Sequence, residues 1–107
     1  MDVVPLVDRI LVALGRLTTE PIEQKRMFGG VGFMWRGYLV AGTHGADELL
    51  VRLAEDADPG EGLRPMVMRE RVARGWYFAA PEVIATDDDL EAQLTRSMRF
   101  VEGLPPR

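Results

Sequence analysis

A glycine pair, Gly29-Gly30, interrupts an apolar run within residues 26–37 and constrains the fold more than any other feature of the sequence. Glycine adopts positive φ without steric cost, so a pair between extended stretches predicts a bend, a bulge or a close backbone approach. A phosphate-binding glycine loop would need a helix directly after the glycines. Instead, apolar side chains occupy every second position afterwards, at Val31, Phe33 and Trp35, which predicts a strand. We interpret the pair as a structural bend, with a small-ligand or enzyme site around it as an alternative.

Alternating apolar and polar residues continue along the chain and predict an antiparallel sheet of five or six strands. We place these strands at residues 23–28, 31–36, 38–43, 49–53, 64–68 and 74–80. The dipeptide Arg36-Gly37 lies between two of them, as in a tight hairpin turn. We predict a turn at residues 44–47, a loop at residues 54–63, and a linking segment at residues 69–73.

Both ends of the chain carry the spacing of amphipathic helices. In residues 3–17, apolar side chains recur every three or four positions, with Asp2 as the cap. Thr86 and three following aspartates fit the start of a second helix, because a capping side chain and negative charge stabilise a helix N-terminus. The apolar stripe of that helix is Leu90, Leu94, Met98, Val101 and, beside them, Phe100, and Gly103 ends it. The predicted fold class is α+β in two layers, an antiparallel sheet flanked by N-terminal and C-terminal helices, in one domain of residues 1–107.

Several separated pieces of the chain together resemble a known family. The central piece is Arg26-Met27-Phe28-Gly29-Gly30, followed by Gly32 and the turn glycine Gly37. The later pieces are Val51-Arg52-Leu53, Arg64-Pro65-Met66, Gly75-Trp76 and the closing Leu104-Pro105-Pro106-Arg107. With these pieces, from about Ile22 to the end, the chain resembles the TfoX N-terminal domain family, named after the TfoX/Sxy regulators of bacterial competence. The resemblance implies a regulatory or adaptor domain that acts through protein–protein interaction in competence or transcription, and not an enzyme.

The composition excludes several kinds of functional site. Cysteine is absent, which excludes disulfides, thiolate catalysis and zinc–thiolate sites, and the single histidine, His44, cannot form a histidine metal site alone. We predict His44 to be a solvated turn residue, with no catalytic residue, no metal and no cofactor. No apolar run approaches the roughly 20 residues of a membrane span, and the N-terminus lacks the basic region of a signal peptide. We expect a bacterial, cytoplasmic protein without a membrane partner.

Arginines make one short segment of this acidic chain basic. The net charge is −4, whereas a sequence-independent nucleic-acid binder usually has a basic surface. The candidate nucleic-acid contacts are Arg64, Arg69, Arg71 and Arg74. Because of these arginines, a nucleic-acid-binding regulator is an alternative function. We nevertheless expect no nucleic-acid partner for this chain alone.

Aromatic and methionine side chains are concentrated on the predicted strands. If Phe33 and Trp35 face the helices, Met34 and Arg36 face away from them, and Tyr77 opposes Trp76 and Phe78. The strands then carry more apolar positions than one sheet face can bury. We predict a homodimer or another protein partner at a sheet face or edge, burying roughly 1,200–2,000 Å².

Overall fold

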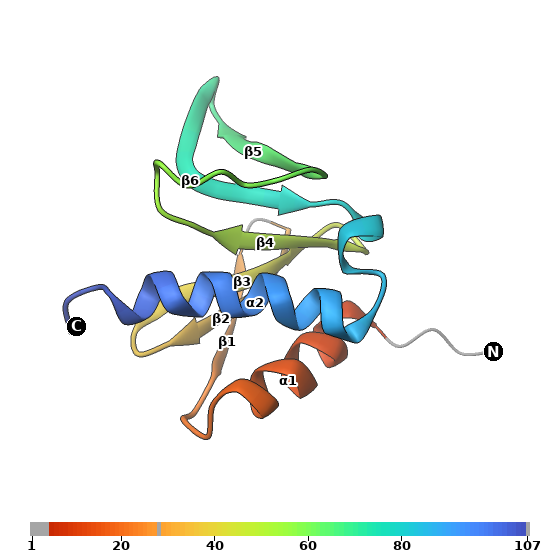
Figure 1. The fold of residues 1–107 in the computed structure, drawn as a ribbon, viewed down its shortest axis with the longest axis vertical. Helices are drawn as coiled ribbons and strands as arrows, with labels where there is room; N and C mark the ends of the chain where they lie inside the picture. Colours follow the sequence, from red (N-terminus) through yellow and green to blue (C-terminus); the bar gives the residue numbers. More distant parts are fainter. Residues whose placement is uncertain (1–4, 28, 107) are drawn as a thin grey trace.

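The computed structural model describes residues 5–27 and 29–106 and has the predicted α+β fold, with six antiparallel strands and a helix near each end. Figure 1 shows the helices on one side of an open sheet. In chain order the elements are α1 (Leu6–Leu17), β1 (Glu23–Met27), β2 (Gly30–Trp35), β3 (Tyr38–His44), β4 (Glu48–Arg52), β5 (Leu63–Met68), β6 (Arg71–Ala79), the 3-10 helix η1 (Pro81–Ile84) and α2 (Asp87–Glu102).

The strands lie in the order β1-β2-β3-β4-β6-β5, and every neighbouring pair is antiparallel. The predicted turn at Arg36-Gly37 is present, with φ of 55° and 81°. The predicted five-residue link at 69–73 is wrong, because Arg69 and Glu70 alone connect β5 to β6, with φ of 49° and 67°. Both turns therefore have the positive φ values that suit the twist of a two-residue hairpin.

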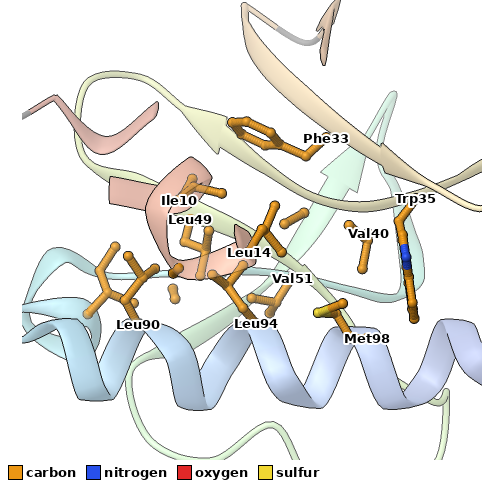
Figure 2. Packing of buried hydrophobic residues seen from close by; sticks show 14 of the residues in the cluster. Ile10, Leu14, Phe33, Trp35, Val40, Leu49, Val51, Leu90, Leu94 and Met98 are labelled. Carbon is orange, nitrogen blue, oxygen red and sulfur yellow. The ribbon is translucent and has the colours of Figure 1, made fainter. Parts of the chain in front are cut away.

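The core lies between the helices and one face of the sheet (Figure 2). The sheet contributes Phe33, Trp35, Val40, Leu49 and Val51, all at most 2% exposed. From the helices come Ile10, Leu14, Leu90, Leu94 and Met98. The prediction that Phe33 and Trp35 face the helices is therefore confirmed, and burial of this apolar area is the main force that holds the two layers together.

The start of α2 is capped as predicted, because Thr86 Oγ1 accepts a hydrogen bond from the amide of Asp89 at 3.1 Å. The predicted cap of the first helix, Asp2, and the residue Val3 lie outside the described residues. Leu17 was predicted on the buried face of α1 but is 36% exposed, and Ala13 is buried there instead. Leu17 is the last residue of α1. Among residues 5–27 and 29–106, no helix is long and apolar enough to cross a membrane.

One buried hydroxyl ties α2 to the sheet. Ser97 is fully buried, and its Oγ accepts a hydrogen bond from the amide of Arg52 at 2.8 Å. Arg52 is the last residue of β4. The bond joins α2 to the end of β4, and because the partly buried amide of Arg52 gains its partner from Ser97, this serine has a structural role.

Candidate interaction site

The glycine pair lies at the start of β2: Gly29 precedes the strand, and Gly30 is its first residue and lies against β3. Gly29 has φ of +73°, and a β-carbon on Gly30 would lie 2.0 Å from the carbonyl oxygen of Thr43. Beside it, the amide of Val31 donates to Thr43 Oγ1 at 2.9 Å. Only glycine fits this approach at Gly30, so the pair forms the expected bend. Phe28, the remaining residue of the predicted motif, lies outside the described residues.

Gly32 has a different role on the sheet face that the helices leave open. A β-carbon there would lie 2.6 Å from Met27 Sδ and 2.8 Å from Leu39 Cδ1. The absence of a side chain therefore lets Met27 lie across β2 towards Leu39. These two residues belong to the face that points away from α1 and α2, which we call the open face.

A hollow of about 500 Å³ lies beside the glycine pair, lined by Arg26, Met27, Gly29, Gly30 and Val31. Arg26 is the one charged residue among these lining residues, and none carries a carboxylate or a hydroxyl. The described lining can attract an anion but offers no acid–base pair, because general acid–base catalysis needs a group that gains or loses a proton near neutral pH.

The open face has a hydrophobic cluster of its own. Leu50, Met66 and Phe78 are buried there, and Leu39, Ala73 and Trp76 pack against them half-buried. None of these residues comes from α1 or α2. The predicted alternation is confirmed, since Tyr77 packs in the opposite cluster beneath the helices. The sheet is thus apolar on both faces, and within the described residues the helices cover only one.

His44 lies at the border of the open face and takes part in an ordered network. Its ring stacks on Phe78 with centroids 4.1 Å apart, and Nδ1 lies 3.0 Å from Glu48 Oε1. Arg64 binds the same carboxylate through both of its terminal nitrogens. The prediction that His44 lies in a turn is wrong, because β3 extends through His44 and pairs it with Glu48, while its side chain is 39% exposed. Phe78 lies next to His44 because β6 pairs with β4, and no local sequence pattern predicts this pairing.

The Arg64 guanidinium, and to a lesser extent His44, hold the pKa of Glu48 well below its ordinary value, at about 2. Glu48 is therefore ionised at neutral pH and accepts the proton of His44 Nδ1. Nε2 is the nitrogen left to accept a hydrogen bond in neutral His44. The arrangement orients His44, but catalysis would also need a group for that nitrogen to activate.

The four predicted nucleic-acid contacts do not act alike. Arg64 is held by Glu48 and lies over the ring of Phe78, with its guanidinium carbon 5.0 Å from the centroid. The other three, Arg69, Arg71 and Arg74, are exposed on the hairpin of β5 and β6. No carboxylate of the described residues forms an ion pair with these three. Val67 and Val72 lie opposite each other on the same hairpin and are 60% and 58% exposed.

A cluster that sequence reasoning missed surrounds Arg52. Its guanidinium carbon lies 4.8 Å from the ring centroid of Trp76, 5.2 Å from that of Phe100 and 5.8 Å from that of Tyr38. Tyr38 in turn donates its hydroxyl to the carbonyl oxygen of Pro105 at 2.6 Å. The order β4-β6 places Arg52 opposite Trp76, so the pairing of these strands was the missing information.

Among residues 5–27 and 29–106, no group of three or more histidine and acidic side chains could hold a metal ion. The model of the TfoX N-terminal domain family matches residues 14–101. The chain belongs to this family. Searches among curated proteins and among solved structures gave no match.

The family match places the candidate residues inside the domain. The glycine motif, all six strands and nearly all of α2 fall within residues 14–101. The closing segment from Leu104 onward, part of the original resemblance, lies outside the matched range. The conclusion for fold and family therefore rests on the sheet and α2, which are also the elements that form the open face.

Proposed function

We propose that this TfoX N-terminal domain is a regulatory or adaptor domain that acts by binding another protein, in the control of competence or transcription. The observation that carries the proposal is the open face, where six apolar residues form a cluster that neither helix covers. The partly exposed members of the cluster are Leu39, Ala73 and Trp76. Apolar surface that neighbouring elements leave uncovered marks interaction sites in proteins. Family membership supports the regulatory role, because the family is named after regulators.

We infer that the domain is not an enzyme. The two buried hydroxyl residues, Thr43 and Ser97, each accept a hydrogen bond from a backbone amide, at 2.9 and 2.8 Å. Their oxygens are thus committed to structural bonds, whereas an activated nucleophile is paired with a base. His44 is oriented by Glu48, and its neighbour Thr43 occupies the alternate position of β3.

We also propose that the domain forms a homodimer through the outer edge of β1, which leaves the open face accessible. Glu23 and Lys25 lie on the same side of this exposed edge strand. In an antiparallel pair of β1 strands centred on Gln24, Glu23 of each copy lies opposite Lys25 of the other. Opposite charges at such cross-strand positions stabilise pairing by about 0.2–1 kcal/mol each.

A second candidate function is nucleic-acid binding by the hairpin of β5 and β6. It is favoured by one observation, the exposure of Arg69, Arg71 and Arg74 without an acidic partner among the described residues. Three cations allow only a weak contact with phosphates. Protein binding therefore remains the first proposal, and a titration described in the Discussion separates the two.

Affinity capture of the intact domain from extract of its native cells, with and without nuclease, tests the proposed function. A protein that is retained after nuclease treatment supports the proposal, whereas nucleic acid recovered without protein contradicts it. Two variants locate the contact: Leu39→Lys places a charge on the open face, and Val12→Lys places one on α1, where Val12 is 58% exposed. We expect capture to be lost with the first and kept with the second, once circular dichroism has shown that both fold.

A further inference from the structure

On the open face, beside the hairpin of β5 and β6, lies an apolar hollow of about 160 Å³. It is lined by Leu39 from β3, by Met66 and Met68 from β5, and by Ala73 and Trp76 from β6. None of these lining side chains is charged. An apolar protein cavity of about 150 Å³ holds one benzene molecule, so this hollow has the size of one bulky apolar side chain. The two methionines are unbranched and polarizable and can adapt to the shape of an occupant.

The hairpin that forms one wall of this hollow is curved. β6 changes register against β5 between Pro65 and Val67. At this irregularity Gly75 has φ of +86°, and a β-carbon there would lie 2.6 Å from the carbonyl oxygen of Leu53. Met66 is only 5% exposed, while Met68, nearer the tip, is 45% exposed. The hollow thus has a closed inner end and an accessible outer end, as expected for a site that receives a side chain from solvent.

The hairpin beside the hollow carries exposed positive charge, although the chain as a whole carries a net charge of −4. Arg71 is exposed and is the direct cross-strand partner of Met68. Arg69 follows at the tip of the hairpin. The one acid at that tip is Glu70, and Glu48, farther along the open face, is already bound by Arg64. An apolar hollow with this rim is complementary to an apolar side chain that has acidic neighbours.

We propose that the hollow binds a bulky apolar side chain of a partner polypeptide, with acidic residues on both sides of that side chain contacting Arg71 and the neighbouring rim. This inference rests on the proposed protein-binding function and names the chemistry of the partner. The apolar side chain supplies the buried contact at the centre, and the acidic residues set orientation and the rate of association.

A second copy of this chain is a poor occupant. An acidic and apolar segment in the described residues is Asp87-Asp88-Asp89-Leu90, but Leu90 lies in the first turn of α2 and is fully buried in the core. Duplex nucleic acid presents phosphates, but no apolar side chain that would enter the hollow. The combination of an apolar lining and a basic rim is therefore better matched by an acidic peptide segment.

The test uses the intact domain with ¹³C-labelled methionine methyl groups and four synthetic seven-residue peptides. The central residue is phenylalanine or serine, and the flanking residues are all aspartate or all lysine. We expect the peptide with phenylalanine and aspartates to shift the Met66 and Met68 methyl signals saturably below about 5 mM. Met98, buried on the other side of the sheet, is the internal control and should not shift.

Two pairs of variants check the contact. Met68→Glu should weaken binding by about tenfold or more, while Val67→Glu, on the opposite side of the same exposed strand, should change it less than about twofold. Arg71→Glu should weaken binding and remove its salt dependence, whereas Arg99→Glu on α2 should do neither. Met68 and Val67 are both exposed, so neither change disrupts the core.

Every other outcome overturns the proposal. Equal shifts with aspartate and lysine peptides would refute the acidic partner, and equal shifts with phenylalanine and serine would refute the apolar anchor. No shift up to about 5 mM would refute both, even if affinity capture had identified a protein partner. Shifts of Met66 and Met68 that depend only on protein concentration would show that a second copy occupies the hollow. Failure of capture, in contrast, would refute the proposed function itself.

Discussion

Gly30 lies so close to the backbone of Thr43 that a β-carbon on it would be 2.0 Å from the Thr43 carbonyl oxygen. Because Thr43 lies in β3 and pairs with Leu49 of β4, its carbonyl oxygen cannot move aside without disturbing that pairing. We expect Gly30→Ala to lower the free energy of unfolding by about 2 kcal/mol or more. Gly29→Ala should cost about 1–2 kcal/mol, because its φ of +73° is strained for alanine but the space is open.

Denaturant unfolding of these variants measures both costs. Gly15→Ala is the matched control, because Gly15 is exposed within α1 and no atom lies within 4 Å of its added β-carbon. It should stabilise the protein by about 0.5–1 kcal/mol. If Gly30→Ala were as stable as the parent, the close packing of β2 on β3 would not constrain this position.

The Glu48 carboxylate makes the stability depend on pH in the acid range. Its pKa is about 2 in the folded protein, below the ordinary value of 4.5. A lowered folded pKa stabilises the protein fully above about pH 4.5, and that contribution is lost as the pH falls towards 2. Since Arg64 is 53% exposed, we expect Glu48→Gln to cost only about 0.5–1 kcal/mol at pH 7.

Unfolding free energies of parent and Glu48→Gln, measured from pH 7 to pH 2, should converge as the pH falls. The difference between the two curves removes the titration of the other carboxylates, which both proteins share. A constant difference across this range would mean that the carboxylate does not carry the effect. Arg64→Gln should produce a similar loss if the ion pair is its cause.

Removing the hydroxyl of Ser97 should loosen the attachment of α2 to the sheet. Ser97→Ala leaves the amide of Arg52 without its 2.8 Å partner in a partly buried position. We expect a loss of about 0.5–1.5 kcal/mol, the usual net contribution of one hydrogen bond. Thr95→Ala serves as the control, because Thr95 bonds only to a carbonyl of its own helix. Comparable losses for the two variants would refute a special role for Ser97.

The proposed dimer makes a charge-dependent prediction for light scattering. Glu23→Lys replaces two attractive contacts with Lys25 by two repulsive ones and should weaken dimerisation by about tenfold or more. Lys25→Glu should do the same, and the double variant with both charges exchanged should restore the dimer. A parent protein that stays monomeric at high micromolar concentration would contradict the dimer altogether.

Duplex DNA should bind this domain weakly and without specificity. Three exposed arginines, at about −0.9 per phosphate contact, give a salt slope of about −2.7 on a log–log plot. We expect a dissociation constant no better than about 10⁻⁴ M at 150 mM salt. Sub-micromolar binding to a labelled duplex, lost in the Arg69→Ala, Arg71→Ala and Arg74→Ala triple variant, would instead establish the nucleic-acid function.

The parts of the fold that follow from local patterns were predictable from the sequence. Alternation at Phe33 and Trp35 predicted their burial, and Thr86 marked the start of α2, because each signal depends on neighbouring residues alone. The turn at Arg69-Glu70 was missed because neither residue type favours positive φ. In that turn, pairing of β5 with β6 on both sides overrides the local preference.

The site was harder to predict, because its parts are distant in the sequence. His44 contacts Phe78, and Arg52 contacts Trp76, only because β6 lies between β4 and β5 in the sheet and pairs with β4. The curvature that places Met66 over the open face comes from a register change and not from a composition signal. Strand order and register are set by the whole sheet, so the local periodicity of the sequence does not predict them.

The strand order also determines how the protein opens. β1 to β4 form a meander in which each strand pairs with its immediate successor, so their contacts close short loops. The hairpin of β5 and β6 joins that meander through one ladder, from Leu49–Ala79 to Arg52–Trp76, across the loop that follows β4. We expect such a unit to dock after the meander has formed and to detach before the meander unfolds. Amide protons at the tip of the hairpin should therefore exchange with solvent through a local opening. Amide protons of β2 and β3 should exchange only when the whole domain unfolds.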